Sequence, residues 1–459
     1  MYVLPALLLC WSLRARHGAA GMHAAIRAGE PSPMSRDEHG SRLEQTSMTS
    51  QEDRPPGAAT LLQHHPYRAP EGFAGLQLPV YRASTVLFDN VRQMRERRWR
   101  DKSGYTYGLH GTPASFALER RLADIEGARH ALLCPSGLSA IALVDLALLR
   151  QGDEVLLPCN AYAPGRELAQ ETLAAWGIST RIYDPLDPAS LRERIGANTR
   201  LLWLEAPGSV SMEMPDLRAL VALAREAGVL TAIDNTWSAG LALRPFELGI
   251  DVSMQALTKY QSGGADVLMG AVLVRDDALH DALLDAHMRL GLGVGGDDVG
   301  LLLRGLASMP LRYAAHDASA RRVAEWLLRR PEVERVLHPA LPGSPGHAYW
   351  LRDFRGAAGL FSVVLRPEFE PARVDAFVDA LRLFGIGYSW GGPMSLAVPY
   401  DLRHARAAVS PPVGSQAQAV PAEAHYLVRL NIGLERPEDL IADLEQALRA
   451  ALSPRTGVA

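Results

Sequence analysis

Cysteine is scarce in this sequence. The 459 residues contain three cysteines, Cys10, Cys134 and Cys159. They are odd in number and far apart, so they form neither a CxxC pair nor a disulfide framework. This usage fits a reducing compartment, and we expect a cytoplasmic protein. Cys134 and Cys159 flank apolar, strand-like runs, and we interpret both as small buried hydrophobic residues.

The sequence also lacks a strong charge of one sign and a long apolar run. The formal net charge is −4, and no long basic run occurs. Nucleic acid is therefore not an expected partner. Residues 3–13 form an apolar run that is too short to span a membrane. No other segment is a membrane-spanning candidate, so we expect no membrane partner.

Residues 1–68 show no sustained hydrophobic period. They are rich in Pro, Gly, Ala, His and Arg. A secretory signal is one interpretation, but residues 3–13 have neither a positively charged start nor a clear small-residue cleavage site. We prefer to interpret residues 1–68 as a disordered or over-extended N-terminal segment, with Met34 and Met48 as alternative start sites.

Helices and short apolar strands alternate from residue 112 to about residue 306. Thr112 and Pro113 are a typical helix start, and Gly127 ends this helix. Further helices are predicted at residues 139–149, 165–176, 188–195 and 216–227, and strands at residues 154–157, 178–183, 201–204 and 229–233. This pattern predicts an α/β fold with a mostly parallel central sheet and helices on both faces.

The pattern changes near Ser308. A long helix at residues 312–330 precedes a strand at 361–366, a helix at 372–384, a strand at 426–430 and a helix at 437–452. Within the last helix, Leu440, Leu444 and Leu448 have the spacing of a buried face. We predict a smaller α+β domain here, with a surface loop at residues 403–423.

Lys259 and Asp234 form the most informative pair of residues. Lys259 stands between Thr258 and Tyr260, and Asp234 ends an apolar strand. Enzymes that use pyridoxal phosphate need a lysine for the Schiff base and a carboxylate that keeps the pyridine nitrogen protonated. An isolated pair of this kind is more often an exposed lysine and an ordinary strand-end aspartate. The surrounding residues therefore decide between the two interpretations.

The segments around this pair match a known family in order along the chain. The matching runs lie at residues 204–209, 233–237, 249–253, 258–260, 338–343, 388–392 and 428–435. From about Leu76 to Leu452 the sequence resembles the cystathionine β-lyases, within the Cys/Met-metabolism family of pyridoxal phosphate enzymes. The resemblance implies the fold-type I, PLP-dependent transferase-like fold. It implies an N-terminal arm at residues 69–111, a large PLP-binding domain at 112–307 and a C-terminal α+β domain at 308–459.

The cofactor phosphate needs hydrogen-bond donors. Gly137 and Leu138 start an apolar helix, where backbone amides can hold an anion. A generic strand-to-helix turn is the alternative, but the resemblance assigns the phosphate to these two amides. The Thr258 hydroxyl is a further candidate. By resemblance, Tyr107 contacts the phosphate of a neighbouring subunit, and Tyr162 stacks on the ring and assists proton transfer.

Arg429 is the main candidate for substrate binding. It lies in the middle of an apolar strand, where a charged side chain is costly unless it is paired. A clamp for a carboxylate is the natural use of such an arginine, and an internal ion pair is the alternative. By resemblance, Ser389 and Trp390 also contact the substrate. Trp390 favours β- over γ-chemistry, because related γ-enzymes usually carry another residue there.

Three segments depart from the family pattern. Leu109 and His110 replace two arginines after Tyr107-Gly108, so the usual phosphate-binding arginine is missing, and either His110 or another residue compensates or affinity is lower. No tyrosine is present at His287-Met288, where the β-lyases carry one. Residues 393–395 replace an acidic residue. The substrate pocket is therefore less well defined than the cofactor site.

Together these features predict a PLP-dependent carbon–sulfur lyase that cleaves cystathionine to homocysteine, pyruvate and ammonia in methionine biosynthesis. No metal site is expected. Lys259 and Tyr162 are the predicted catalytic residues, and the expected assembly is a homotetramer of dimers with shared active sites. The alternatives are a γ-synthase, a γ-lyase or a broad cysteine-S-conjugate β-lyase on the same scaffold, and a non-catalytic protein with this fold.

Overall fold

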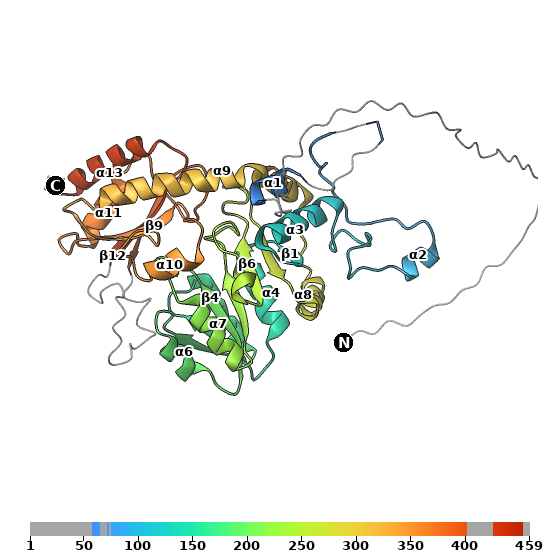
Figure 1. The fold of residues 1–459 in the computed structure, drawn as a ribbon. Helices are drawn as coiled ribbons and strands as arrows, with labels where there is room; N and C mark the ends of the chain where they lie inside the picture. The colour runs from blue at the N-terminus through green and yellow to red at the C-terminus, as the bar shows by residue number, and fades with distance from the viewer. Residues whose placement is uncertain (1–56, 65–70, 73–74, 402–425, 453–459) are drawn as a thin grey trace, which may run out of the picture. The chain divides into compact units, whose positions relative to one another are not determined.

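The computed structural model describes residues 57–64, 71–72, 75–401 and 426–452 (Figure 1). The predicted surface loop at residues 403–423 and most of the predicted N-terminal segment lie outside these ranges. Within the described ranges, none of the helices is both long enough and apolar enough to cross a membrane.

A seven-stranded sheet forms the centre of the larger part of the chain. Its order is β1-β7-β6-β5-β4-β2-β3. The strands are β1 (His130–Cys134), β2 (Glu154–Pro158), β3 (Ser179–Tyr183), β4 (Thr199–Glu205), β5 (Leu230–Asp234), β6 (Val252–Ala256) and β7 (Gly270–Val274). Only β7 runs antiparallel to its neighbours. The prediction of an α/β fold with a mostly parallel sheet is confirmed.

Helices cover both faces of this sheet. They are α3 (Pro113–Glu126), α4 (Gly137–Leu148), α5 (Ala163–Glu167) with the π-helix η1 (Leu168–Leu173), α6 (Pro188–Arg194), α7 (Leu217–Glu226), the 3-10 helix η2 (Pro245–Leu248) and α8 (Asp277–Leu290). Because side chains alternate along a strand, Leu202 and Leu204 enter one core and Leu201 and Trp203 the other. Continuous apolar strands therefore result from burial on both sides.

A second sheet belongs to the C-terminal part of the chain. Its order is β10-β11-β12-β9-β8, and only the β10–β11 pair is parallel. The strands are β8 (Val333–Leu337), β9 (Leu360–Leu365), β10 (Gly385–Ile386), β11 (Leu396–Asp401) and β12 (Tyr426–Asn431). Helices α10 (His347–Asp353), α11 (Pro371–Asp379) and α13 (Pro437–Leu452) accompany it. Leu440, Leu444 and Leu448 are buried in its core, as their spacing predicts.

The long helix α9 differs from the prediction. It spans Gly296–Leu327 and so begins sixteen residues before the predicted start at 312. The predicted domain boundary at residues 307/308 therefore falls inside one continuous helix. Pro310 lies in the helix interior, where proline removes one hydrogen bond. Buried side chains on both sides of it, including Leu306, Met309 and Tyr313, compensate for this loss.

A short helix lies inside the segment predicted to be disordered or over-extended. Helix α1 (Ala58–Gln63) contacts α3 and α9. Leu62 is buried, and the Gln63 side chain donates a hydrogen bond to the Ala307 carbonyl at 2.6 Å. The prediction of a disordered or over-extended segment up to residue 68 is therefore wrong for residues 57–64. Leu62 packs into the core and Gln63 bonds to α9. The other short N-terminal helix is α2 (Val91–Arg95).

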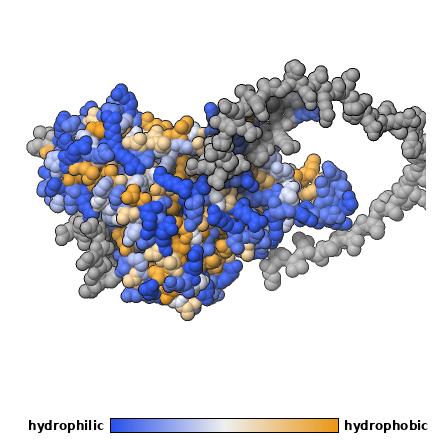
Figure 2. Space-filling model, in the orientation of Figure 1, coloured by the Kyte–Doolittle hydropathy of each residue, from blue (hydrophilic) through white to orange (hydrophobic). Residues whose placement is uncertain are grey.

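Hydrophilic and hydrophobic residues are interspersed on the face drawn in Figure 2. Single exposed apolar residues of this kind are normal for a folded protein. Cys134 is fully buried, as predicted, whereas Cys159 is only partly buried. Cys159 follows the last residue of β2, where the chain leaves the sheet.

Candidate active site

A cavity of about 640 Å³ opens where the parallel strands β4 and β5 end. Ligands of α/β proteins bind at this edge of the sheet, because the loops there leave a crevice. The second sheet closes the cavity with residues of β9, β11 and β12. Nine of the ten residues predicted to contact cofactor or substrate line it: Gly137, Leu138, Tyr162, Asp234, Thr258, Lys259, Ser389, Trp390 and Arg429.

Asp234 is the last residue of β5 and lines the floor of the cavity. Its carboxylate accepts a hydrogen bond from the Thr236 backbone N–H at 3.0 Å. Burial raises the pKa of Asp234, while Thr236 and the more distant Lys259 oppose the shift. A buried carboxylate at a cavity wall is stabilised by a cationic ligand, and a protonated pyridine ring is such a ligand.

Lys259 faces the same cavity. Its ammonium donates a hydrogen bond to the Ser389 hydroxyl at 2.7 Å and lies 5.2 Å from the centre of the Trp390 ring. Burial and the nearby Arg429 lower the pKa of Lys259 to about 8, against the opposing effect of Asp234. An amine with a lowered pKa is available as a neutral nucleophile near neutral pH.

The N-terminus of α4 supplies the anion site. Ser136 caps the helix, accepting a hydrogen bond from the Ser139 N–H, and Gly137 and Leu138 are its first two residues. Backbone N–H groups of a first helical turn have no partner within the helix. A side chain on Gly137 would lie 2.7 Å from Cβ of Ala256, so only glycine lets the turn approach β6. The Thr258 hydroxyl is held between the N–H and carbonyl of Met269, at 3.3 Å each.

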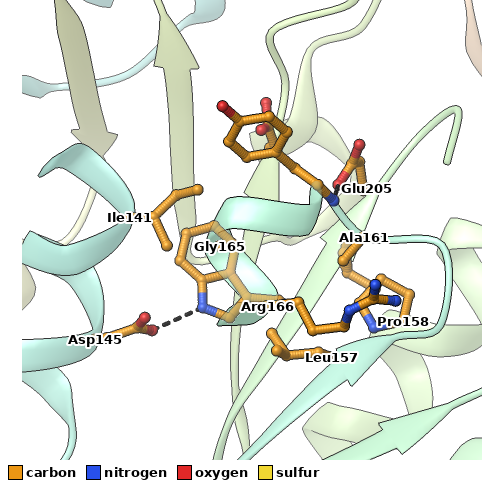
Figure 3. A pocket seen from close by; sticks show the side chains of 12 residues that line it. Ile141, Asp145, Leu157, Pro158, Ala161, Gly165, Arg166 and Glu205 are labelled. Carbon is orange, nitrogen blue, oxygen red and sulfur yellow. Dashed lines mark hydrogen bonds between the residues drawn. The ribbon is translucent and has the colours of Figure 1, made fainter. Parts of the chain in front are cut away.

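Tyr162, Glu205 and Asp234 line both this cavity and a smaller pocket. Figure 3 shows the smaller pocket with Glu205 at its edge. Glu205 ends β4 directly beside Asp234, and its carboxylate accepts the backbone N–H of Tyr162 at 2.7 Å. Burial, then Asp234, raises the pKa of Glu205 well above its ordinary value. Burial and Asp234 also raise the pKa of Tyr162, so its hydroxyl remains protonated at neutral pH.

Arg429 lies in the middle of β12 and is buried. Its guanidinium donates to the Ser389 carbonyl at 3.4 Å and lies over the Tyr400 ring, 5.3 Å from the ring centre. Within the described ranges, no carboxylate lies at ion-pair distance from it. The alternative of an internal ion pair therefore finds no partner there, and the arginine faces the cavity without a counter-charge.

Ser389 holds the two basic residues in one place. Its backbone has a φ of 80°, in the left-handed region that non-glycine residues rarely adopt. The hydroxyl accepts from Lys259 and the carbonyl from Arg429. Strain of this kind concentrates at functional sites, where the surrounding contacts maintain it.

Tyr107 does not line this cavity. It is half exposed, pairs with Thr85 in an isolated bridge, and its hydroxyl lies 3.4 Å from that of Ser84. A role at another subunit's site stays a prediction. His110 is buried between the rings of Trp99 and Phe116, with centroids 5.7 and 5.6 Å away. It does not line this cavity.

Sequence reasoning missed Glu205 and Tyr400. Glu205 lies within the matching run at residues 204–209, and its place at a strand end beside Asp234 was an available signal. No sequence pattern pointed to Tyr400, because the pairing of β11 with β12 is what brings it to Arg429. The cavity as a whole offers a helix N-terminus for a phosphate, a buried carboxylate for a pyridinium and a reactive lysine. These residues fit pyridoxal phosphate.

Comparison with known proteins agrees with this geometry. Residues 59–449 match the family described as Cys/Met metabolism PLP-dependent enzyme. The chain is 42% identical to the cystathionine beta-lyase of Bordetella avium over 398 residues, 85% of this chain and 97% of the relative. It is 38% identical to the cystathionine beta-lyase of Escherichia coli strain K12 over 369 residues, 80% of this chain and 91% of the relative.

Among solved structures, the cystathionine gamma synthase of Xanthomonas oryzae pv. oryzae superposes with a TM-score of 0.77 at 31% identity. The match covers 87% of this chain and 99% of that chain. The family match extends over far more than half of the chain and includes both sheets. The chain belongs to the Cys/Met metabolism family of PLP-dependent enzymes.

Proposed function

We propose that this protein is a cystathionine β-lyase, which converts cystathionine and water to homocysteine, pyruvate and ammonia. The observation that carries the proposal is the arrangement of Lys259, Ser389 and Trp390 around one point of the cavity. Relatives named cystathionine beta-lyase at 38–42% identity support it. Such an enzyme acts in methionine biosynthesis, and we place it in the cytoplasm.

The residues divide into those that hold the cofactor and those that act on the substrate. The amides of Gly137 and Leu138 and the Thr258 hydroxyl bind the phosphate, and Asp234 binds the pyridinium. Pyridoxal phosphate, when bound, supplies a sink for the electrons left at the substrate Cα. Glu205 keeps the loop that carries Tyr162 in position through its bond to the Tyr162 N–H.

On the substrate, Arg429 binds the α-carboxylate, and the Ser389 carbonyl fixes the guanidinium. The neutral Lys259 amine removes the Cα proton. The Cβ–S bond then breaks, and the sulfur leaves with the bonding electrons as the thiolate of homocysteine. Tyr162 is protonated at neutral pH, and burial raises its pKa further, so its hydroxyl donates a proton to the departing sulfur. Addition of water to the remaining three-carbon fragment yields pyruvate and ammonia.

The lowered pKa of Lys259 predicts how cofactor uptake depends on pH. Only the neutral amine reacts with the cofactor aldehyde, and it predominates above a pKa of about 8. We expect the rate at which cofactor-free protein gains visible absorbance to rise with pH up to about 8 and then to level off. A rate that keeps rising to about pH 10 would mean an ordinary lysine pKa.

The active assembly is proposed to be a homotetramer built from dimers, with Tyr107 of one subunit at the phosphate of the next. Because Leu109 makes no phosphate contact, more of the anchoring falls on Tyr107. We expect Tyr107→Phe to weaken retention of the cofactor. Mixing inactive Tyr107→Ala with inactive Lys259→Ala should restore part of the activity, since a mixed dimer contains one intact site.

The measurement for this prediction is subunit exchange followed by the lyase assay. Formation of mixed dimers is checked independently by native mass spectrometry. If mixed dimers form and activity stays absent, Tyr107 does not act across the interface.

The experiment that tests the function is a parallel assay on cystathionine, cystine and methionine, scored for pyruvate against 2-oxobutyrate. Cystathionine should give pyruvate and be the preferred substrate. Formation of 2-oxobutyrate would favour a γ-enzyme, the activity named for the Xanthomonas structure. Equal or better turnover of cystine would indicate a broad cysteine-S-conjugate lyase. Protein that stays colourless after addition of pyridoxal phosphate would indicate a non-catalytic member.

A further inference from the structure

We propose that Tyr400 is a positioning residue for Arg429, and that its ring fixes the guanidinium where the substrate α-carboxylate binds. The inference rests on the proposed use of Arg429 as the carboxylate clamp. Tyr400 is uncharged and lies in β11, whereas Arg429 lies in the neighbouring strand β12. Tyr400 therefore contributes to recognition of the α-carboxylate without touching the reacting atoms.

The pairing of two strands places the two side chains on one face. In the β11–β12 pair, Val398 lies opposite Arg429, and Tyr400 lies two residues further along β11. Residues two apart on a strand point to the same face, so Tyr400 is the diagonal neighbour of Arg429. Leu360 of β9 also lines the cavity, so this face of the second sheet forms one of its walls.

The burial of Arg429 makes such a neighbour necessary. A buried guanidinium without an acidic partner is costly, and no acidic side chain of the described residues lies at ion-pair distance. Burial lowers the pKa of Arg429, and the Tyr400 hydroxyl, by electrostatic attraction and by a hydrogen bond, is the strongest influence in the opposite direction. An aromatic face within about 6 Å attracts a guanidinium without neutralising it. The positive charge therefore stays available for a substrate carboxylate.

The other tyrosines near Arg429 do not offer the same support. Tyr388 is 82% exposed, and Tyr162, whose backbone N–H bonds to Glu205, influences the pKa of Arg429 less than Tyr400 does. Only Tyr400 has its ring beneath the guanidinium, at 5.3 Å from the ring centre. On the other side, the Ser389 carbonyl accepts from the same group. Arg429 is thus held between a ring and a carbonyl.

The test separates binding of the carboxylate from turnover. The probes are L-norleucine and L-norleucinamide, which share a side chain and lack a leaving group at Cβ. Their dissociation constants are measured with the holoenzyme by titration of its visible absorbance. We expect Tyr400→Leu to weaken binding of norleucine about tenfold and to leave binding of norleucinamide within about twofold. Tyr400→Phe keeps the ring and removes the hydroxyl that interacts with the guanidinium. It should bind norleucinamide like the wild type and norleucine more tightly than the leucine variant does.

Two controls make the outcome decisive. Tyr349→Leu removes the ring beneath Arg352, a similar contact at 5.2 Å in α10 that does not line the cavity, and it should change neither constant. In an Arg429→Ala background, Tyr400→Leu should have no further effect on norleucine, because the two residues act as a unit. Tyr400→Gln serves in place of the leucine variant if that variant does not fold.

An equal loss for acid and amide, or a loss that persists without Arg429, would overturn the proposal. This experiment measures the binding of norleucine and norleucinamide and does not measure cleavage of the Cβ–S bond. A failure of the cystathionine assay would therefore leave this result interpretable, and failure of the Tyr400 test would leave the lyase assignment intact.

Discussion

Replacing Lys259 with alanine is expected to abolish turnover, with a loss of about a thousandfold or more, because the base that removes the Cα proton is gone. The visible absorbance of the bound cofactor should disappear too, while the protein stays folded. Lys259→Arg should behave like the alanine variant, since arginine keeps a positive charge at pH 7 but is not a nucleophile. Absorbance and lyase rate measure the two effects separately.

The sequence makes the attachment site easy to identify. The chain contains two lysines, Lys102 and Lys259. Lys102 pairs with Glu119 at 2.6 Å and does not line the cavity. Reduction of the holoenzyme with borohydride should therefore label one peptide, the one that contains Lys259. Lys102→Arg is the matched control and should keep both colour and activity. Label on Lys102, or normal lyase rates in Lys259→Ala, would refute the assignment.

Replacing Arg429 with alanine should have the second largest effect. Loss of a buried, charge-assisted contact to the substrate carboxylate should lower kcat/KM about a hundredfold or more. Arg429→Lys should recover only part of this, because an ammonium cannot form the bidentate contact. The cofactor absorbance should be retained in both variants, since Arg429 is assigned to the substrate. Steady-state kinetics with cystathionine provides the measurement.

Thermal unfolding of the cofactor-free Arg429→Ala protein gives an independent check. Removing a buried charge that has no acidic partner among the described residues should leave the melting temperature unchanged or raise it. A marked destabilisation would show that Arg429 is a structural residue, and its kinetic effect would then need another explanation.

Local patterns predicted most elements of the fold. Thr112, Pro113 and Gly127 mark the start and end of α3 where the structure has them. The predicted strands at residues 154–157, 201–204 and 229–233 correspond to β2, β4 and β5. These signals work because capping, turn geometry and burial on both faces act within a few residues. The predicted start of the long helix at residue 312 was wrong, because α9 continues through Pro310 and begins at Gly296.

In the candidate site, too, the sequence reveals single residues, whereas only the structure shows the contacts between them. Asp234 at a strand end, Gly137 and Leu138 at a helix start and Arg429 in an apolar strand are each unusual in their own surroundings, so the sequence reveals them. The contacts that join them are not local. Lys259 meets Ser389 across 130 residues, and Glu205 meets Tyr162 across 43. Hydrophobic periodicity cannot predict contacts between residues so far apart in the sequence.

The sequence by itself determined the family, the cofactor and the residues with an evident chemical role. The tertiary structure decided how those residues act together. Register between β4 and β5 places Glu205 beside Asp234, and register between β11 and β12 places Tyr400 beneath Arg429. The left-handed backbone of Ser389 brings its hydroxyl to Lys259 and its carbonyl to Arg429. The physical reason is that strand pairing and side-chain packing depend on the whole core, whereas residue type and local pattern depend on a few neighbours.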